Sequence, residues 1–157
     1  MVVRDVLLHP HPLLTRRAEP ATDPEAVVAD LLDTMGSFGH CVGIAAPQIG
    51  ELVRVAVVDC SGHRKAPANH GRLVLVNPVI VAAAGAEVGR EGCLSIPELT
   101  GDVRRATHVT VEAEGLRVDA EGFEARAIQH EIDHLDGLLF LDRVESLEAD
   151  VFQRKRR

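Results

Sequence analysis

The chain has no tryptophan, no tyrosine and only four phenylalanines among its 157 residues. Surfaces that bind nucleic acids stack bases on aromatic rings and gather basic side chains. Here 24 acidic residues outnumber 17 basic ones, which gives a formal charge of −7. The composition therefore disfavours a nucleic-acid-binding protein.

Long apolar segments and paired cysteines are also absent. The longest apolar run, residues 79–86, is far shorter than the roughly 20 residues that cross a bilayer. No apolar run of signal-peptide length follows Met1, and the three cysteines, Cys41, Cys60 and Cys93, are an odd number. We therefore expect a soluble cytoplasmic protein with reduced thiols and no membrane partner.

The first third of the chain is expected to contain one helix. Residues 9–14 alternate proline with histidine and are predicted to be extended, because proline disfavours helical geometry in the residue before it. Apolar residues at helical spacing predict an amphipathic helix over residues 24–36, with Asp23 as its N-cap. Residues 43–50 are uncharged, but they contain too much glycine, proline and alanine for a regular element.

The middle of the chain is predicted to form antiparallel sheet. Strand character is expected in three segments, residues 52–59, 73–81 and 108–119. The second segment is interrupted at Asn77-Pro78, where proline cannot donate to a ladder and implies an edge or a bulge. The third alternates around Glu114-Gly115, which predicts a tight hairpin. Residues 60–71 are polar and are expected to form a flexible loop.

Helical spacing returns over residues 122–136, with an apolar stripe made by Ile128, Ile132 and Leu135. Gly137 is positioned to end this helix, and Ser146 is expected to cap a short terminal helix. The order of elements predicts an α+β fold. We expect a single domain over residues 1–157, with antiparallel sheets packed around the 122–136 helix.

The sequence HEIDH, residues 130–134, lies on this helix. His130 and His134 are one turn apart on the same face, so both can reach one ion, and Glu131 is beside them. Two histidines on a polar helix face are also compatible with ordinary solvated residues. A third ligand would favour a metal site.

A zinc protease is the first interpretation of HExxH, but the third histidine of the extended protease motif is replaced by Phe140. Glu145 and Glu148 are the only later glutamates, and little chain remains after them. Upstream, Cys93 is either a buried core residue or a thiolate that completes a three-ligand site with an open fourth position. A closed structural zinc site would need a fourth protein ligand, and no motif supports one.

Three segments together resemble the peptide deformylase family: GIAAPQ (43–48), EGCLS (91–95) and QHEIDH (129–134). The resemblance implies an α+β metalloenzyme that removes the N-formyl group from the initiator methionine of new polypeptides and releases formate. Two imidazoles and one thiolate suit zinc, iron, cobalt and nickel. The resemblance implies Fe²⁺ in the cell, often replaced by Zn²⁺ or Ni²⁺ on isolation.

Roles follow for the residues of these motifs. Cys93, His130 and His134 are expected to hold the ion, and Glu131 is positioned to act as general acid and base. The resemblance implies that the Gln48 side chain and the Leu94 backbone N–H stabilise the oxyanion. It also implies that Glu91 and Arg105 form a supporting salt bridge, and we assign Gln129 a structural role.

The methionine side chain of the substrate requires an apolar pocket beside the ion. Phe123 and Ala127 precede His130 at helical spacing and are expected to line it, although core packing explains the same pattern. Ile44 is expected to form the opposite wall, and Gly43 offers backbone groups to an extended peptide. Cys41 departs from the family pattern, which has glycine there, so peptide preference is open.

The last residues, QRKRR at 153–157, are basic although the chain is acidic overall. A basic terminus is usually solvated surface. Ribosomal RNA attracts basic segments, and the C-terminal helix of the family docks near the exit tunnel. The resemblance therefore implies a weak, salt-sensitive ribosome contact through this tail, next to N-formyl-Met nascent peptides as the substrate.

Overall fold

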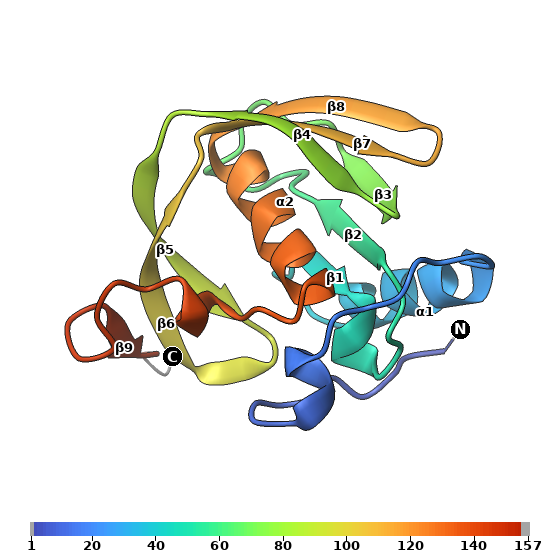
Figure 1. Cartoon of the computed structure of the whole chain (residues 1–157), viewed down its shortest axis with the longest axis horizontal. Coiled ribbons are helices and arrows are strands. Elements are labelled where there is room, and N and C mark those ends of the chain that lie inside the picture. Colours follow the sequence, from blue (N-terminus) through green and yellow to red (C-terminus); the bar gives the residue numbers. More distant parts are fainter. Residues whose placement is uncertain (1, 155–157) are drawn as a thin grey trace.

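Helix α2 (Gly122–Leu135) runs through the centre of the structure, between three small sheets (Figure 1). The computed structural model describes residues 2–154. Within these residues every strand pairing inside the sheets is antiparallel. The predicted α+β fold, with antiparallel sheets around the motif helix, is confirmed.

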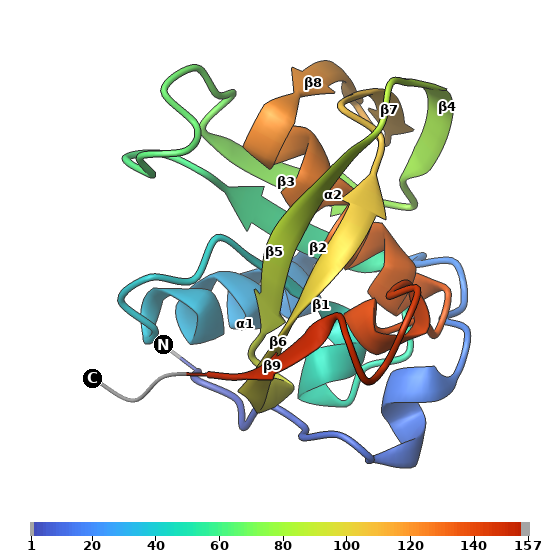
Figure 2. The same ribbon diagram turned by 90° about the vertical axis from the view of Figure 1, so that its left-hand side faces the viewer.

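Each sheet has three strands. The first contains β1 (Gly43–Ala45), β2 (Val55–Asp59) and β3 (Arg72–Val76), in that order. The second has the order β4 (Val79–Ala84), β7 (His108–Ala113) and β8 (Leu116–Glu121). The third has the order β5 (Glu87–Cys93), β6 (Ile96–Arg105) and β9 (Val151–Gln153). In Figure 2 the long β5–β6 ribbon crosses one face of α2, and β7–β8 is the predicted hairpin.

The predicted strand over residues 73–81 is two strands of different sheets. Asn77 adopts the left-handed conformation, with φ of 50°, and Pro78 follows it. The Asn77 side chain accepts a bond from the Ala21 N–H at 2.8 Å and donates to the Ala21 carbonyl at 3.0 Å. The prediction of one interrupted strand is wrong, because this anchored turn sends the chain from the first sheet to the second.

Helix α1 (Glu25–Gly36) lies where the apolar spacing placed it and packs against β1 and β2. Its N-cap is Pro24, with no side-chain cap bond, so the prediction of Asp23 as the cap is wrong. The expected extended lead-in contains a 3-10 turn, η1 (Pro12–Thr15). Proline is compatible with a first helical position, where no N–H donor is needed.

The segment 43–50, expected to be irregular, contains β1 and a 3-10 turn, η2 (Ala46–Ile49). Its small side chains allow close packing: Ala45 and Ala46 are fully buried. Because burial leaves backbone groups no access to water, they must pair within the protein. The prediction failed because composition alone does not report this burial.

No terminal helix follows Ser146. Its N–H donates to Asp150 Oδ2 at 2.9 Å and its Oγ accepts from the Ala149 N–H at 3.1 Å, which closes a turn. The chain then forms β9, which pairs with β6. The predicted helix is wrong because an open sheet edge was available. Of the basic tail, residues 155–157 lie outside the described part of the chain.

The core surrounds α2. Ile128 and Ile132 pack with apolar residues of the first two sheets, and Leu135 packs against Ala45 and Ala56. The apolar stripe predicted for this helix is therefore buried. No helix within residues 2–154 has the length and apolar character needed to cross a bilayer.

Gly137 follows the end of α2, and its surroundings predict that replacing it with alanine destabilises the protein more than replacing Gly115 does. It has φ of 77°, and a Cβ there would lie 2.7 Å from the Thr15 carbonyl oxygen. Gly115, in the β7–β8 turn, has φ of 70° but open space around it. In both alanine variants the left-handed backbone conformation costs about 1–2 kcal/mol. The free energy of unfolding of Gly137→Ala should fall by about 1 kcal/mol or more beyond that of Gly115→Ala, because only Gly137 has a backbone atom in the way of a Cβ. Urea unfolding at matched metal content measures this, and equal losses would contradict the packing described.

Candidate metal centre

Helix α2 presents His130, Glu131 and His134 toward the interior, where all three are buried. Their spacing places them along one side of the helix. Strand β5 ends at Cys93, which reaches the same place from the facing sheet. The register slips between Gly92, opposite Thr100, and Cys93, opposite Ile96, so the strand turns where the thiol is presented.

The three residues predicted as ligands lie together. One donor atom from each of Cys93, His130 and His134 falls within 4.8 Å of the others, and all three residues are buried. Cys93 Sγ lies 3.4 Å from His134 Nε2. One thiolate and two imidazoles form a donor set that suits a borderline-soft divalent ion and leaves a fourth position open. The residues present therefore fit a metal.

The cysteines differ in acidity. Burial alone would raise the pKa of the Cys93 thiol, but the neighbouring His134 and His130 outweigh it and lower that pKa well below its ordinary value. Burial raises the pKa of Cys41 and of Cys60 to about 12. Since the thiolate is the metal-binding form, Cys93 is the cysteine suited to a ligand role.

The Glu91 carboxylate orients His130. The Nδ1–H of His130 donates to Glu91 Oε1 at 2.9 Å, which leaves Nε2 for the ligand cluster. Arg105 donates two bonds to the same carboxylate, at 2.8 and 2.9 Å, and Arg126 donates one at 2.7 Å. The salt bridge between Glu91 and Arg105 is thus present, and it forms part of a larger network.

Arg105 extends this network to Asp133, on α2 between the two histidines. Arg143 also pairs with Asp133, at 2.8 Å. Burial alone would raise the pKa of the Glu91 carboxyl, but Arg105 and His130 outweigh burial and hold it well below its usual range. A buried charge is stable when it is paired and bonded in this way. The network locks β5, β6 and α2 together.

Glu131 lines the cavity and has few polar partners among the described residues. Burial raises the pKa of its carboxyl, and its Oε1 has no hydrogen-bond partner among residues 2–154. A Cβ on Gly43 would lie only 2.6 Å from Glu131 Oε2. The glycine at position 43 is therefore required for the carboxylate to occupy this place.

Gln48 is held in one orientation. Its Oε1 accepts from the Ala45 N–H at 2.9 Å, while its Nε2 donates to Ser95 Oγ at 3.1 Å and lies 3.6 Å from Cys93 Sγ. The Gln48 side chain therefore caps a backbone group with its oxygen and points its amide donor toward the ligand cluster. The Leu94 N–H, in the turn after Cys93, has no partner among the described residues.

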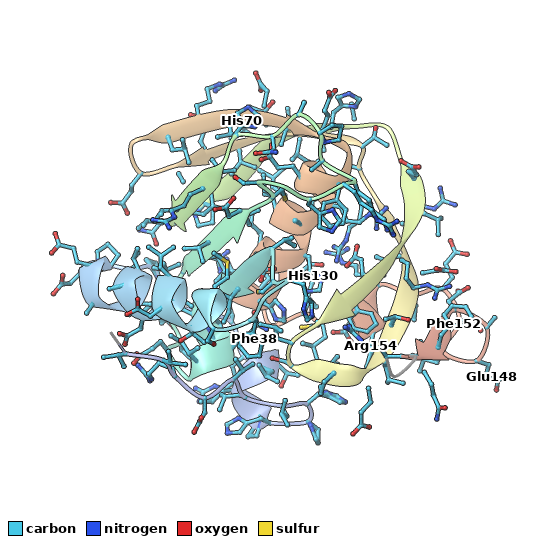
Figure 3. All side chains as sticks on the ribbon, turned by 180° about the vertical axis from the view of Figure 1, so that it is seen from behind. Phe38, His70, His130, Glu148, Phe152 and Arg154 are labelled. Carbon is cyan, nitrogen blue, oxygen red and sulfur yellow. The ribbon has the colours of Figure 1, made fainter. Side chains whose placement is uncertain are left out.

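A cavity of about 480 Å³ opens beside the cluster. Figure 3 shows His130 between Phe38 and Arg154, which line the same cavity. Eight of the predicted site residues contribute to its lining: Gly43, Gln48, Cys93, Leu94, Phe123, Ala127, His130 and Glu131. The remaining ligand candidate, His134, lies behind this lining and is 1% exposed.

Ile44 does not line the cavity. Alternate residues of a strand face opposite sides, so Gly43 and Ile44 cannot share a face. Ile44 is fully buried and packs in the core with Leu31 and Met35 of α1. Val42, which precedes β1, lines the cavity together with Gly43.

Several lining residues were not anticipated. Arg126 lies four residues before His130, a helical spacing that pointed to this face. His63, in the loop expected to be flexible, stacks on the Phe123 ring with centroids 4.3 Å apart. Arg90 and Arg154 also line the cavity. No local signal marks His63, Arg90 or Arg154, because strand pairing and loop folding bring these three residues to the cavity.

Cys41 also lines the cavity. Its thiol donates to the carbonyl of Gly43, two residues along the chain at the start of the edge strand β1, at 3.1 Å. The thiol therefore occupies a backbone acceptor beside the path that an extended peptide would use.

Comparisons with known proteins agree with this geometry. The family model described as polypeptide deformylase matches residues 3–150. Peptide deformylase 2 of Vibrio cholerae is 40% identical over 163 residues, covering 99% of this chain and 94% of its own. Peptide deformylase 1 of Bacillus subtilis is 43% identical over 153 residues, covering 92% and 91%.

Solved structures show the same relationship. A peptide deformylase from Legionella pneumophila superposes with a TM-score of 0.83 at 36% identity, covering 94% of this chain and 89% of that one. A class I type b peptide deformylase from Acinetobacter baumannii gives a TM-score of 0.82 at 33% identity, covering 92% and 100%. With the three motifs gathered around one cavity, these matches show that the chain belongs to the polypeptide deformylase family.

Proposed function

We propose that the cavity beside Cys93, His130 and His134 is where this protein removes the N-formyl group from the initiator methionine of new polypeptides. As a member of the deformylase family, the chain is a metal-dependent hydrolase of N-formyl nascent peptides. The observation that carries the assignment is the meeting of the three ligand candidates with Glu131 and Gln48 at one opening. We also propose that residues 1–157 form one catalytic domain.

Cys93, His130 and His134 would hold the ion, which we propose to be Fe²⁺ in the cell and Zn²⁺ or Ni²⁺ after isolation. When bound, such an ion supplies a nucleophile by lowering the pKa of a water molecule toward about 7. The chain's part is to supply a thiolate and to fix the histidines, as the Glu91 bond does for His130.

Glu131 is the proposed proton carrier. Its buried carboxyl has a raised pKa and a free oxygen at the cavity, so it can take a proton from the attacking water and pass it to the amine nitrogen that leaves. Gln48 Nε2 and the Leu94 N–H are the proposed donors to the oxyanion. Gln48 Nε2 lies 3.6 Å from Cys93 Sγ, and the Leu94 N–H, directly after Cys93, has no partner among the described residues.

The methionine side chain is proposed to lie against Phe123 and Ala127. The peptide that follows it would extend beside β1, which is an edge strand with only β2 as a neighbour among the described strands. An exposed edge can bind an extended peptide through backbone bonds. Gly43 lies on this edge next to Glu131.

We also propose a cytoplasmic location, where new polypeptides are made. The three cysteines are free, which agrees with a reducing compartment. We propose that the basic residues Lys155, Arg156 and Arg157 contact the ribosome weakly, through attraction to the negatively charged phosphates of its RNA.

Replacing Glu131 with alanine should abolish most of the activity and leave the metal in place. Loss of acid–base catalysis typically lowers the rate by about 10²–10⁴-fold. Formate release from a formyl-Met peptide, together with metal content, measures both effects. The exposed Glu112→Ala variant is the control, and near-normal turnover by Glu131→Ala would refute its assigned role.

Cys93→Ser should weaken metal retention sharply, because it removes the soft thiolate ligand. Cys60→Ser, at a buried cysteine outside the cluster, should retain the ion. The test is metal analysis of each protein after purification without oxygen and dialysis, which also identifies the native ion. If the two variants lose metal equally, Cys93 is not a ligand.

The tail is tested by replacing Lys155, Arg156 and Arg157 together with serine. Truncation from residue 153 would be less specific, since Gln153 pairs with Leu99 and Arg154 lines the cavity. Ribosome co-sedimentation at low salt should fall, and hydrolysis of a free formylated peptide should stay unchanged. Unchanged co-sedimentation would leave the tail as ordinary solvated surface.

A further inference from the structure

Three arginines line the cavity, and two of them are already engaged. Arg90 pairs with Asp102 at 2.8 Å and lies 3.9 Å from the centre of the Phe152 ring. Arg126 donates to Glu91 at 2.7 Å, as well as to two backbone carbonyls. These two guanidinium groups are committed to holding the walls of the cavity.

Arg154 is different. It is exposed, and within residues 2–154 no carboxylate lies within salt-bridge distance of it. Its backbone is fixed by β9, which pairs with β6, and by the bond from its N–H to the Glu98 carbonyl at 2.8 Å. Arg154, labelled in Figure 3, therefore brings to the lining of the cavity an exposed cation that has no carboxylate partner among residues 2–154.

Gly92 explains how the guanidinium reaches this position. Gly92 and Arg154 lie on the same face of the β5-β6-β9 sheet, with Thr100 between the strands as the partner of Gly92. A Cβ on Gly92 would overlap the Arg154 guanidinium. Because glycine has no Cβ, the Arg154 guanidinium can lie against the residue that directly precedes Cys93.

A substrate bound for hydrolysis has its formyl group at the ligand cluster, so the rest of the peptide leaves through the opening where Arg154 lies. Peptide carbonyl oxygens are strong acceptors, and a terminal carboxylate is stronger. We propose that Arg154 donates hydrogen bonds to a carboxyl or carbonyl oxygen of the peptide downstream of the formylated residue. This inference rests on the proposed function and makes strand β9 part of the substrate-binding surface.

The contact acts on binding and not on the chemical step, because Arg154 is separated from the formyl group by the methionine residue of the substrate. Its loss should raise KM and leave kcat unchanged for substrates that reach it. For a substrate that ends at the methionine, loss of Arg154 should leave KM unchanged. The rise in KM should be larger for a peptide with a free C-terminal carboxylate than for its C-terminal amide if Arg154 binds a carboxyl oxygen. This comparison distinguishes a carboxyl oxygen from a carbonyl oxygen as the acceptor.

The experiment compares Arg154→Met with wild type on formyl-Met-Ala-Ser, its C-terminal amide and formyl-Met amide. The KM for the tripeptide amide should rise roughly three- to tenfold, the scale for one partly solvated charged hydrogen bond. The free acid should show a larger rise, and formyl-Met amide no change. Arg154→Lys should restore part of the binding. Arg117→Met, which removes an exposed arginine on β8 paired with Glu112, is the matched control.

A rise shared equally by all three substrates, or no rise for any, would overturn the proposal. Binding of the product peptide Met-Ala-Ser, measured by calorimetry on metal-loaded protein, reads the contact without turnover. Arg154→Met should weaken it and Arg117→Met should not. Failure of the proposed function would appear in the wild type as absent formate release, whereas failure of this inference appears only in the comparison of variants.

Discussion

The buried Glu91 carboxylate is the interaction on which the arrangement of this site depends. It accepts bonds from His130, Arg105 and Arg126, and so joins strand β5 to β6 and to α2. An unpaired carboxylate would be costly at this depth, and the bonds to His130, Arg105 and Arg126 offset that cost. Cys93 is two residues from Glu91, and anchoring the carboxylate therefore also sets where the thiol meets the histidines.

Different elements of the fold contribute different parts of the site around the anchored Glu91 carboxylate. Helix α2 carries two of the proposed ligands and the proposed proton carrier, and strand β5 carries the third proposed ligand and the buried Glu91 carboxylate. The segment before β2 carries Gln48. Gly43 and Gly92 serve the site by having no side chain: the first leaves room for the Glu131 carboxylate and the second for the Arg154 guanidinium. On the side of β5 the cavity is lined by Arg90 and Glu91, and on the side of α2 Phe123 and Ala127 contribute apolar side chains.

Features that depend on the spacing of nearby residues could be predicted from the sequence. Helical period predicted the motif helix with its buried stripe, alternation predicted the β7–β8 hairpin, and three short motifs predicted which residues meet at the cluster. Features that depend on distant pairing could not. Ile44 faces the core because strand alternation is set by β2, and β9 forms because β6 offers a free edge. Arg154 reaches the cavity only as a result of that second pairing.

We propose that one ion, held by Cys93, His130 and His134, makes this cavity a deformylase site. The most direct measurement is anaerobic titration of metal-free protein with Fe²⁺ while formate release from a formyl-Met peptide is followed. Activity should start near zero, rise in proportion to added metal and stop rising at one equivalent per chain. Full formate release before metal is added, or a rise that continues to two equivalents, would contradict the account.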